Sequence, residues 1–111
     1  MTRLILVGAA VAGLLAPAAA APARLGVTAK EFRFSLSRTA LKRGPAVIEL
    51  DNFGQDVHDL RLRRIGGTRT YGLPETEPGR RTELNVTLRP GTYRLFCSLH
   101  PALMTQMVIV R

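Results

Sequence analysis

Hydrophobic and polar residues alternate in short stretches along most of this chain. Phe32, Phe34 and Leu36 have polar neighbours on both sides, and the same alternation occurs over residues 84–88. A period of two places successive side chains on opposite faces of a β-strand. No stretch after residue 21 has a sustained helical repeat of apolar residues. The pattern therefore predicts an all-β domain.

Glycine, proline and asparagine separate the predicted strands. Strands are expected at residues 27–29, 32–36, 46–50, 58–63, 84–88, 92–97 and 107–110. The stretch from Arg64 to Arg81 contains four glycines and two prolines, so it is predicted to be mostly loop, with at most a short strand near Tyr71. About six to eight short strands at this spacing indicate a single-domain, two-sheet β-sandwich.

The alternation also predicts which side chains face the core. His58 is predicted to share one strand face with Leu60 and Leu62, and Cys97 is predicted to share one with Tyr93. Both His58 and Cys97 are therefore expected on the inner faces of their strands. Tyr93 follows a Pro-Gly turn and is predicted to be a buried corner residue. Met107 is predicted to lie in the core, on the same face as Ile109.

The first twenty residues have the pattern of a secretory signal peptide. Arg3 precedes an uncharged apolar run over residues 4–15, and small residues lead to a predicted cleavage after Ala20. A membrane span needs about 20 apolar residues, which makes an uncleaved anchor the weaker alternative. Residues 21–111 are then one exported domain, expected to be periplasmic, on the cell surface or secreted.

The chain is strongly basic. It has 16 lysines and arginines against 8 acidic residues, a formal net charge of +8, which becomes +7 without Arg3. These charges are spread along the chain, so most are expected to be solvated surface. They would speed encounter with an acidic redox partner, and association with a membrane surface stays open. No aromatic platform or known motif accompanies the charge, and a nucleic-acid partner is not expected.

Cysteine, histidine and methionine, the residues that bind soft metal ions, are rare in this chain, and most of them lie between positions 97 and 107. Cys97 is the only cysteine, His58 and His100 are the only histidines, and only Met104 and Met107 lie beyond the N-terminal segment. One cysteine cannot form an internal disulfide, and a free thiol in an exported protein is prone to oxidation. A thiolate, two imidazoles and a weak thioether suit copper. Taken singly, His58 and Cys97 would more often be structural core residues.

The sequence around these residues resembles the cupredoxins, the small blue copper proteins. Residues 52–58 resemble their first-histidine loop, and residues 88–97 resemble the strand that enters their metal site. The spacing Cys97-x2-His100-x3-Met104 resembles their ligand loop. The resemblance implies a Greek-key β-sandwich with one type 1 copper, ligated by His58, Cys97, His100 and weakly by Met104, in a protein expected to be a monomer.

Two features depart from the family pattern. The gap from His100 to Met104 is intermediate between the shorter and longer ligand loops of the family, so only the order of ligands is carried over. Asp59 stands where many members have asparagine. Its carboxylate could accept a hydrogen bond from the backbone or hydroxyl of Ser98 and tie the two ligand segments together. The alternation with His58 equally allows Asp59 to point away.

These features favour an electron carrier that passes single electrons between redox proteins outside the cytoplasm. A copper-delivery protein is the alternative, although such proteins usually have open sites rich in methionine or histidine. An enzyme is not expected, because further catalytic coppers need further histidines and a binuclear copper centre needs a second cysteine.

The residues after His100 predict where electrons enter and leave. Pro101, Ala102 and Leu103 are apolar and lie in a loop that would meet solvent. The edge of the His100 imidazole is therefore expected within a small apolar docking patch. In the alternative, Ala102 and Leu103 fold inward and bury His100.

Overall fold

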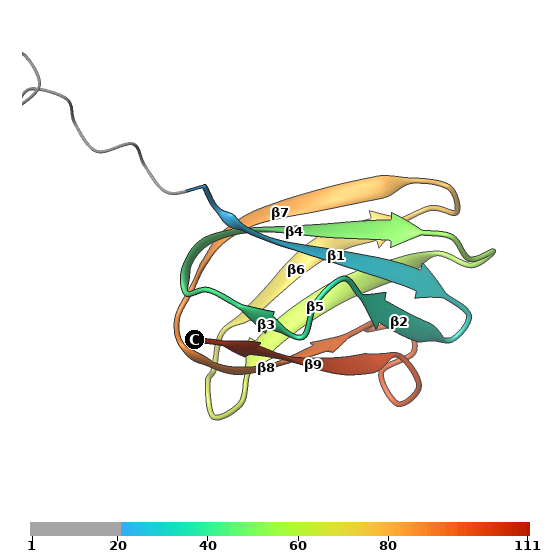
Figure 1. The fold of residues 1–111 in the computed structure, drawn as a ribbon. Helices are drawn as coiled ribbons and strands as arrows, with labels where there is room; N and C mark the ends of the chain where they lie inside the picture. Colours follow the sequence, from blue (N-terminus) through green and yellow to red (C-terminus); the bar gives the residue numbers. More distant parts are fainter. Residues whose placement is uncertain (1–20) are drawn as a thin grey trace, which may run out of the picture.

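Nine β-strands and no α-helix make up residues 21–111, the part of the chain that the structure, a computed structural model, describes (Figure 1). The predicted signal peptide, residues 1–20, lies outside the described residues. Within the described part there is no apolar helix of membrane-spanning length. The strands are β1 (Ala23–Lys30), β2 (Arg33–Leu36), β3 (Ala40–Leu41), β4 (Gly44–Asn52), β5 (His58–Arg64), β6 (Thr70–Thr76), β7 (Arg81–Leu88), β8 (Gly91–Phe96) and β9 (Thr105–Val110).

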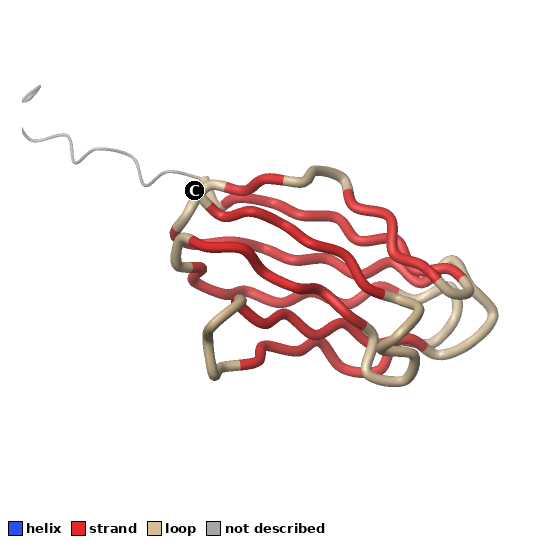
Figure 2. The backbone as a smooth tube through the Cα atoms, turned by 90° about the horizontal axis from the view of Figure 1, so that it is seen from below, coloured by secondary structure: helices blue, strands red, loops and turns tan. Residues whose placement is uncertain are grey.

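The strands form two sheets, which confirms the predicted all-β sandwich (Figures 1 and 2). One sheet has the order β2-β1-β4-β7 and the other has the order β3-β9-β8-β5-β6. β1 pairs with β4, and β3 with β9, in parallel; the remaining pairs are antiparallel. Connections that cross between sheets bring strands distant in sequence side by side.

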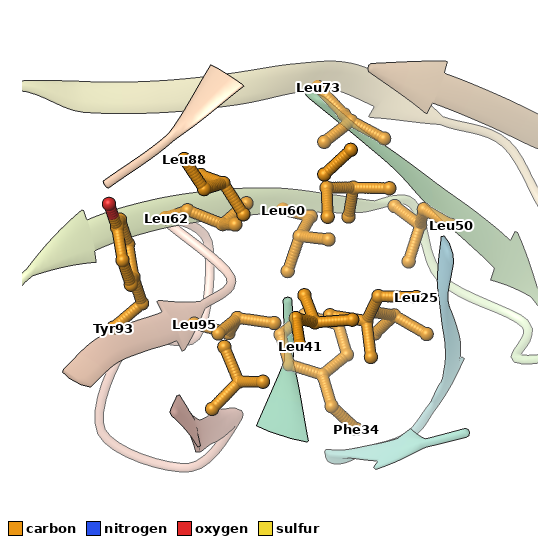
Figure 3. Packing of buried hydrophobic residues seen from close by; sticks show 14 of the residues in the cluster. Leu25, Phe34, Leu41, Leu50, Leu60, Leu62, Leu73, Leu88, Tyr93 and Leu95 are labelled. Atoms are coloured by element: carbon orange, nitrogen blue, oxygen red, sulfur yellow. The ribbon is translucent and has the colours of Figure 1, made fainter. Parts of the chain in front are cut away.

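The core lies between the two sheets (Figure 3). Leu25 and Leu50 from the first sheet pack toward Leu60, Leu62 and Leu95 from the second, and all five are fully buried. These are the inward positions of alternating strands, as the period of two predicts. Burial of such side chains is the main stabilising contribution to a domain of this size.

Tyr93 closes one end of this core. Its ring is buried, and its hydroxyl accepts a hydrogen bond from the backbone N of Arg89 at 3.1 Å and donates one to the Arg89 carbonyl at 2.9 Å. The hydroxyl thereby pins the turn between β7 and β8 to the strand that follows it. The predicted corner role of Tyr93 is confirmed.

The prediction that residues 64–81 are mostly loop is wrong for the middle of this stretch. The seven-residue strand β6 occupies Thr70–Thr76, and β7 begins at Arg81. Pro74 argues against a strand, but β6 is the edge strand of its sheet. A proline at an edge removes no hydrogen bond that the sheet needs.

Two predicted core side chains are exposed. Met107 and Ile109 do share a face of β9, but it is the outer one: Met107 is 46% exposed, while Val108 and Val110 are buried. Every position of this strand from Met107 to Val110 is apolar, so the alternation could not select the inner face. Phe32, the first residue of the strand predicted over residues 32–36, instead lies in the turn between β1 and β2 and is 43% exposed.

The two ends of the sandwich differ in what they carry. One end, the ligand end, is formed by the loops at residues 31–32, 53–57, 77–80 and 97–104. The opposite end, the distal end, is formed by the turns at residues 42–43, 65–69 and 89–90, and β1 starts there. In Figure 1 the start of β1 and the C-terminus lie together at the distal end.

Candidate metal centre

His58 is the first residue of β5 and lies at the ligand end. The pairing of β5 with β6 shifts register between His58 and Leu60, which is a local bulge, and His58 and Asp59 are both buried there. Both ring nitrogens of His58 are buried and have no hydrogen-bond partner. A buried polar atom without a partner loses its hydrogen bonds to water and so lowers the stability of the fold. A metal ion bound to one of these ring nitrogens would offset that loss at the nitrogen it binds.

Cys97 follows β8 and begins a tight connection to β9. Its side chain is a fully buried free thiol. Its backbone N donates to the Met104 carbonyl at 3.1 Å, and its carbonyl accepts from the His100 backbone N at 3.2 Å. The Met104 backbone N in turn donates to the His100 carbonyl at 2.9 Å. These bonds fold Cys97, His100 and Met104 into one compact turn, as their spacing predicts.

The turn brings His100 beside the remote His58. The two imidazole rings are 5.8 Å apart between centroids and are inclined by 64°. His100 is half-buried and also packs edge-on against Phe32, at 4.7 Å between ring centroids. Two imidazoles from segments 42 positions apart in sequence therefore meet at one end of the sandwich.

Met104 and Met107 are separated clearly by burial. Met104 is fully buried at the base of the turn, whereas Met107 lies on the outer face of β9. Within residues 21–111, no three side chains of histidine, cysteine, aspartate or glutamate have the spacing of a metal site. The structure brings His58 to His100 and joins Cys97 to Met104 through the turn, and their role as one ligand set stays a prediction.

Asn52 fixes the loop that leads to His58. Its side-chain amide nitrogen donates to the carbonyls of Asp56 and Thr76, each at 2.8 Å, and its side-chain oxygen accepts from the Gly54 backbone N at 2.8 Å. Asn52 is itself buried. A satisfied buried amide of this kind holds the backbone in one arrangement, so Asn52 fixes the loop that leads into His58.

Asp59 joins the two ligand segments. Its carboxylate accepts hydrogen bonds from the backbone N of Ser98, at 2.7 Å, and from the Ser98 hydroxyl, and it lies 3.4 Å from the Arg61 guanidinium. This is the bond that the sequence predicts for an inward-facing Asp59. Burial raises the pKa of Asp59, but the hydrogen bonds from Ser98, the charge of Arg61 and the Cys97 thiol together hold that pKa below its usual value.

Glu31 belongs to the site and is not indicated by the sequence pattern. It lies in the turn between β1 and β2, accepts hydrogen bonds from the backbone N of Gln55 and of Asp56, and lies 3.6 Å from His58 Nε2. The backbone bond from Asp56, followed by that from Gln55, lowers the pKa of Glu31. A Cβ on Gly54 would lie 2.6 Å from this carboxylate, so a larger residue there would displace the end of the Glu31 side chain.

Exposed apolar side chains lie in the ligand-end loops, several of them in the same turn as His100. Leu103 is 63% exposed, and Pro101 and Ala102 are also exposed, so the predicted outward loop is confirmed and the inward alternative is wrong. Phe32, Phe53 and Leu99 add exposed apolar surface that the sequence did not suggest. We call the group of Phe32, Phe53, Leu99, His100 and Leu103 the ligand-end patch.

Known proteins resemble the chain in sequence family and in fold. The model of the cupredoxin-like domain family matches residues 3–110. None of the curated protein sequences compared with the chain is similar to it.

Solved structures share the fold. A purple cupredoxin from Nitrosopumilus maritimus is 18% identical with a TM-score of 0.62, and the match covers 78% of this chain and 98% of that one. Auracyanin A, a blue copper protein from Chloroflexus aurantiacus, is 18% identical with a TM-score of 0.67, and the match covers 82% of this chain and all of that one. A single-residue variant of amicyanin, in its reduced Cu(I) form, is 20% identical with a TM-score of 0.59, covering 86% and 87% of the two chains.

Proposed function

We propose, since the chain belongs to the cupredoxin-like domain family, that it is an extracytoplasmic type 1 copper protein that carries single electrons between redox partners. One observation carries the proposal. His58 is buried with two unpaired ring nitrogens beside the ring of His100, and His100 shares a turn with the only cysteine. Two imidazoles whose rings meet, with a buried thiol in the same turn as one of them, are a donor set that fits copper.

His58, Cys97 and His100 would be the strong ligands, and the thioether of Met104 the weak one. When bound, the copper supplies a one-electron couple. Asn52 holds the His58 loop and Asp59 holds the Cys97 turn through hydrogen bonds within the protein. A site fixed in this way moves little when the metal charge changes, which favours fast electron transfer.

The closed character of the site favours a carrier over a delivery protein. His58, Cys97 and Met104 are fully buried, and His100 is half-buried. A delivery protein must let ligand groups of its partner reach the metal, and buried donors hinder that exchange. The proposed exported location rests on the pattern of residues 1–20.

The visible absorption spectrum of the protein loaded with Cu(II) tests the proposal. We expect an intense band from thiolate-to-copper charge transfer, which ascorbate should bleach and reoxidation should restore. A colourless Cu(II) complex would contradict type 1 coordination. A coloured complex that does not cycle with ascorbate would support binding but contradict electron transfer.

Met104 rather than Met107 is expected to tune the metal. Met104→Leu should shift the reduction potential and the spectrum while copper remains bound, because a weak thioether ligand would affect the reduction potential more than the affinity for copper. Met107→Leu is the matched control, since Met107 is exposed on β9. The reverse result, with only Met107→Leu changing the spectrum, would show that the two are assigned the wrong way round.

The ligand-end patch is expected to be the surface through which electrons pass. Leu103→Lys should slow electron self-exchange between oxidised and reduced protein by at least about tenfold, because two patches that meet would each carry a new charge. NMR line broadening measures this rate without a partner protein. Ile109→Lys is the control, since Ile109 is 44% exposed on the outer sheet face. Equal slowing in both variants would contradict docking at the patch.

A further inference from the structure

Cationic side chains gather at the distal end. Lys42 and Arg43 lie in the turn between β3 and β4, Arg64 and Arg69 flank the turn between β5 and β6, and Arg89 follows β7. Pairing of Gly44 with Leu88 and of Arg64 with Tyr93 brings these three turns to the same end. None of the five side chains has an ion-pair partner among the described residues.

Acidic side chains lie elsewhere in residues 21–111. Five lie toward the ligand end: Glu31, Asp56, Asp59, Glu75 and Glu77. Three lie on the outer face of the sheet that contains β4 and β7: Glu49, Asp51 and Glu83. Of these three, Glu49 and Asp51 pair with Arg81. The distal end therefore has an uncompensated positive charge.

The distal end also exposes an apolar tip. Ile65 is 59% exposed at the start of the turn between β5 and β6, directly after Arg64. Arg64, Arg69 and Arg89 line a shallow pocket of about 190 Å³ beside it, with Tyr71 and Tyr93. The Arg64 guanidinium donates to the Pro90 carbonyl at 3.4 Å, which holds it at this surface. An exposed apolar side chain at an end that carries several arginines has the composition of a lipid-interface contact.

The chain enters the domain at the same end. Ala23 pairs with Ala46, close to the distal turn at residues 42–43. The sequence before it contains the uncharged apolar run of residues 4–15. If this run is retained as a membrane anchor, the described domain is joined to it through its distal end.

We propose that the distal end docks on the surface of a bilayer that contains anionic lipids. Ile65 would enter the interface, and the arginines and Lys42 would contact the lipid phosphates. The ligand end, on the far side of the sandwich, would then face the aqueous compartment and its redox partners. Docking requires no metal, so it holds or fails independently of the proposed function.

Vesicle binding of the full chain tests the proposal. We expect tighter binding to phosphatidylcholine vesicles with added phosphatidylglycerol than to phosphatidylcholine alone, and weaker binding at high salt. Arg64→Gln with Arg69→Gln should weaken binding by roughly 25-fold, because each basic side chain near an anionic surface contributes about fivefold. Arg33→Gln with Arg80→Gln removes the same charge at the ligand end and should have a much smaller effect.

Three results would overturn the proposal. Equal weakening in both double variants would mean that only net charge matters, and equal binding to both kinds of vesicle would exclude an anionic surface. Tighter binding to duplex DNA or to an acidic protein, lost in the distal variant, would assign this end to that partner instead. The chain beginning at residue 21 contains all nine strands, and its binding should show the same pattern without the apolar run.

A fluorescent probe reports the orientation on the vesicle. An environment-sensitive dye on Ile65→Cys should shift to the blue when anionic vesicles are added, and the same dye on Leu103→Cys should not. Cys97 is fully buried and is not expected to react. A shift at position 103 without one at position 65 would mean that the ligand-end patch contacts lipid, which would contradict the proposed orientation.

Discussion

Replacing Cys97 with serine is expected to abolish the visible absorption band of the copper-loaded protein while the β-sandwich stays folded. The band requires a thiolate bound to copper, and a serine hydroxyl does not ionise in its place. The side chain at position 97 is buried, so we expect a loss of stability of about 1–2 kcal/mol from the polar replacement. Visible absorption measures the first effect, and thermal unfolding followed by circular dichroism measures the second.

Ser98→Ala is the matched control for this experiment. It changes the neighbouring residue and removes one hydrogen bond to Asp59, but it leaves the thiol. The coloured band should therefore persist in Ser98→Ala. A band of undiminished intensity in Cys97→Ser would contradict the assignment of Cys97 as a ligand.

Two substitutions of Asp59 are expected to separate its charge from its hydrogen bonds. Asp59→Asn keeps an acceptor for the Ser98 backbone and removes a negative charge, so it should raise the reduction potential, because a nearby anion favours the oxidised metal. Asp59→Ala leaves two donors of Ser98 without their acceptor. Because Ser98 is exposed and water can replace the lost acceptor, we expect Asp59→Ala to lower the free energy of unfolding by only about 1–2 kcal/mol.

Voltammetry and denaturant unfolding measure these two effects. The pKa of Asp59 in the folded protein lies below the ordinary value of an aspartate, because the effect of burial is outweighed by the hydrogen bonds from Ser98 and the charge of Arg61. The stabilisation from its ionised form is therefore complete at neutral pH and is lost as the pH falls below that ordinary value. Asp59→Asn should lack this contribution to acid unfolding. An unchanged potential in Asp59→Asn at neutral pH would contradict an electrostatic role.

The sequence predicts the parts of this protein that depend on local pattern. The inward positions of Leu60, Leu62 and Leu95 follow from alternation, and the compact turn from Cys97 to Met104 follows from short spacing. The prediction for Met107 is wrong because β9 is apolar on both faces. The strand around Pro74 escapes prediction because its edge position depends on which strands pair with it.

The parts of the site that depend on packing could not be predicted in the same way. Glu31 reaches the loop before His58 only because the turn between β1 and β2 lies at the ligand end, 27 positions earlier in the chain. Phe32 meets His100 for the same reason. The inward direction of Asp59 depends on the bulge in β5, which the alternating pattern does not reveal.

The turn from Ser98 to Met104 begins and ends at the same place on the sheet, so its length is independent of how β8 pairs with β9. Its two ends meet through the bond from the Cys97 backbone N to the Met104 carbonyl, next to the paired residues Phe96 and Thr105. Residues added or removed between His100 and Met104 would therefore change the turn without sliding β8 against β9. Evolution or protein engineering could exchange this one segment for a longer or shorter one and keep the same scaffold.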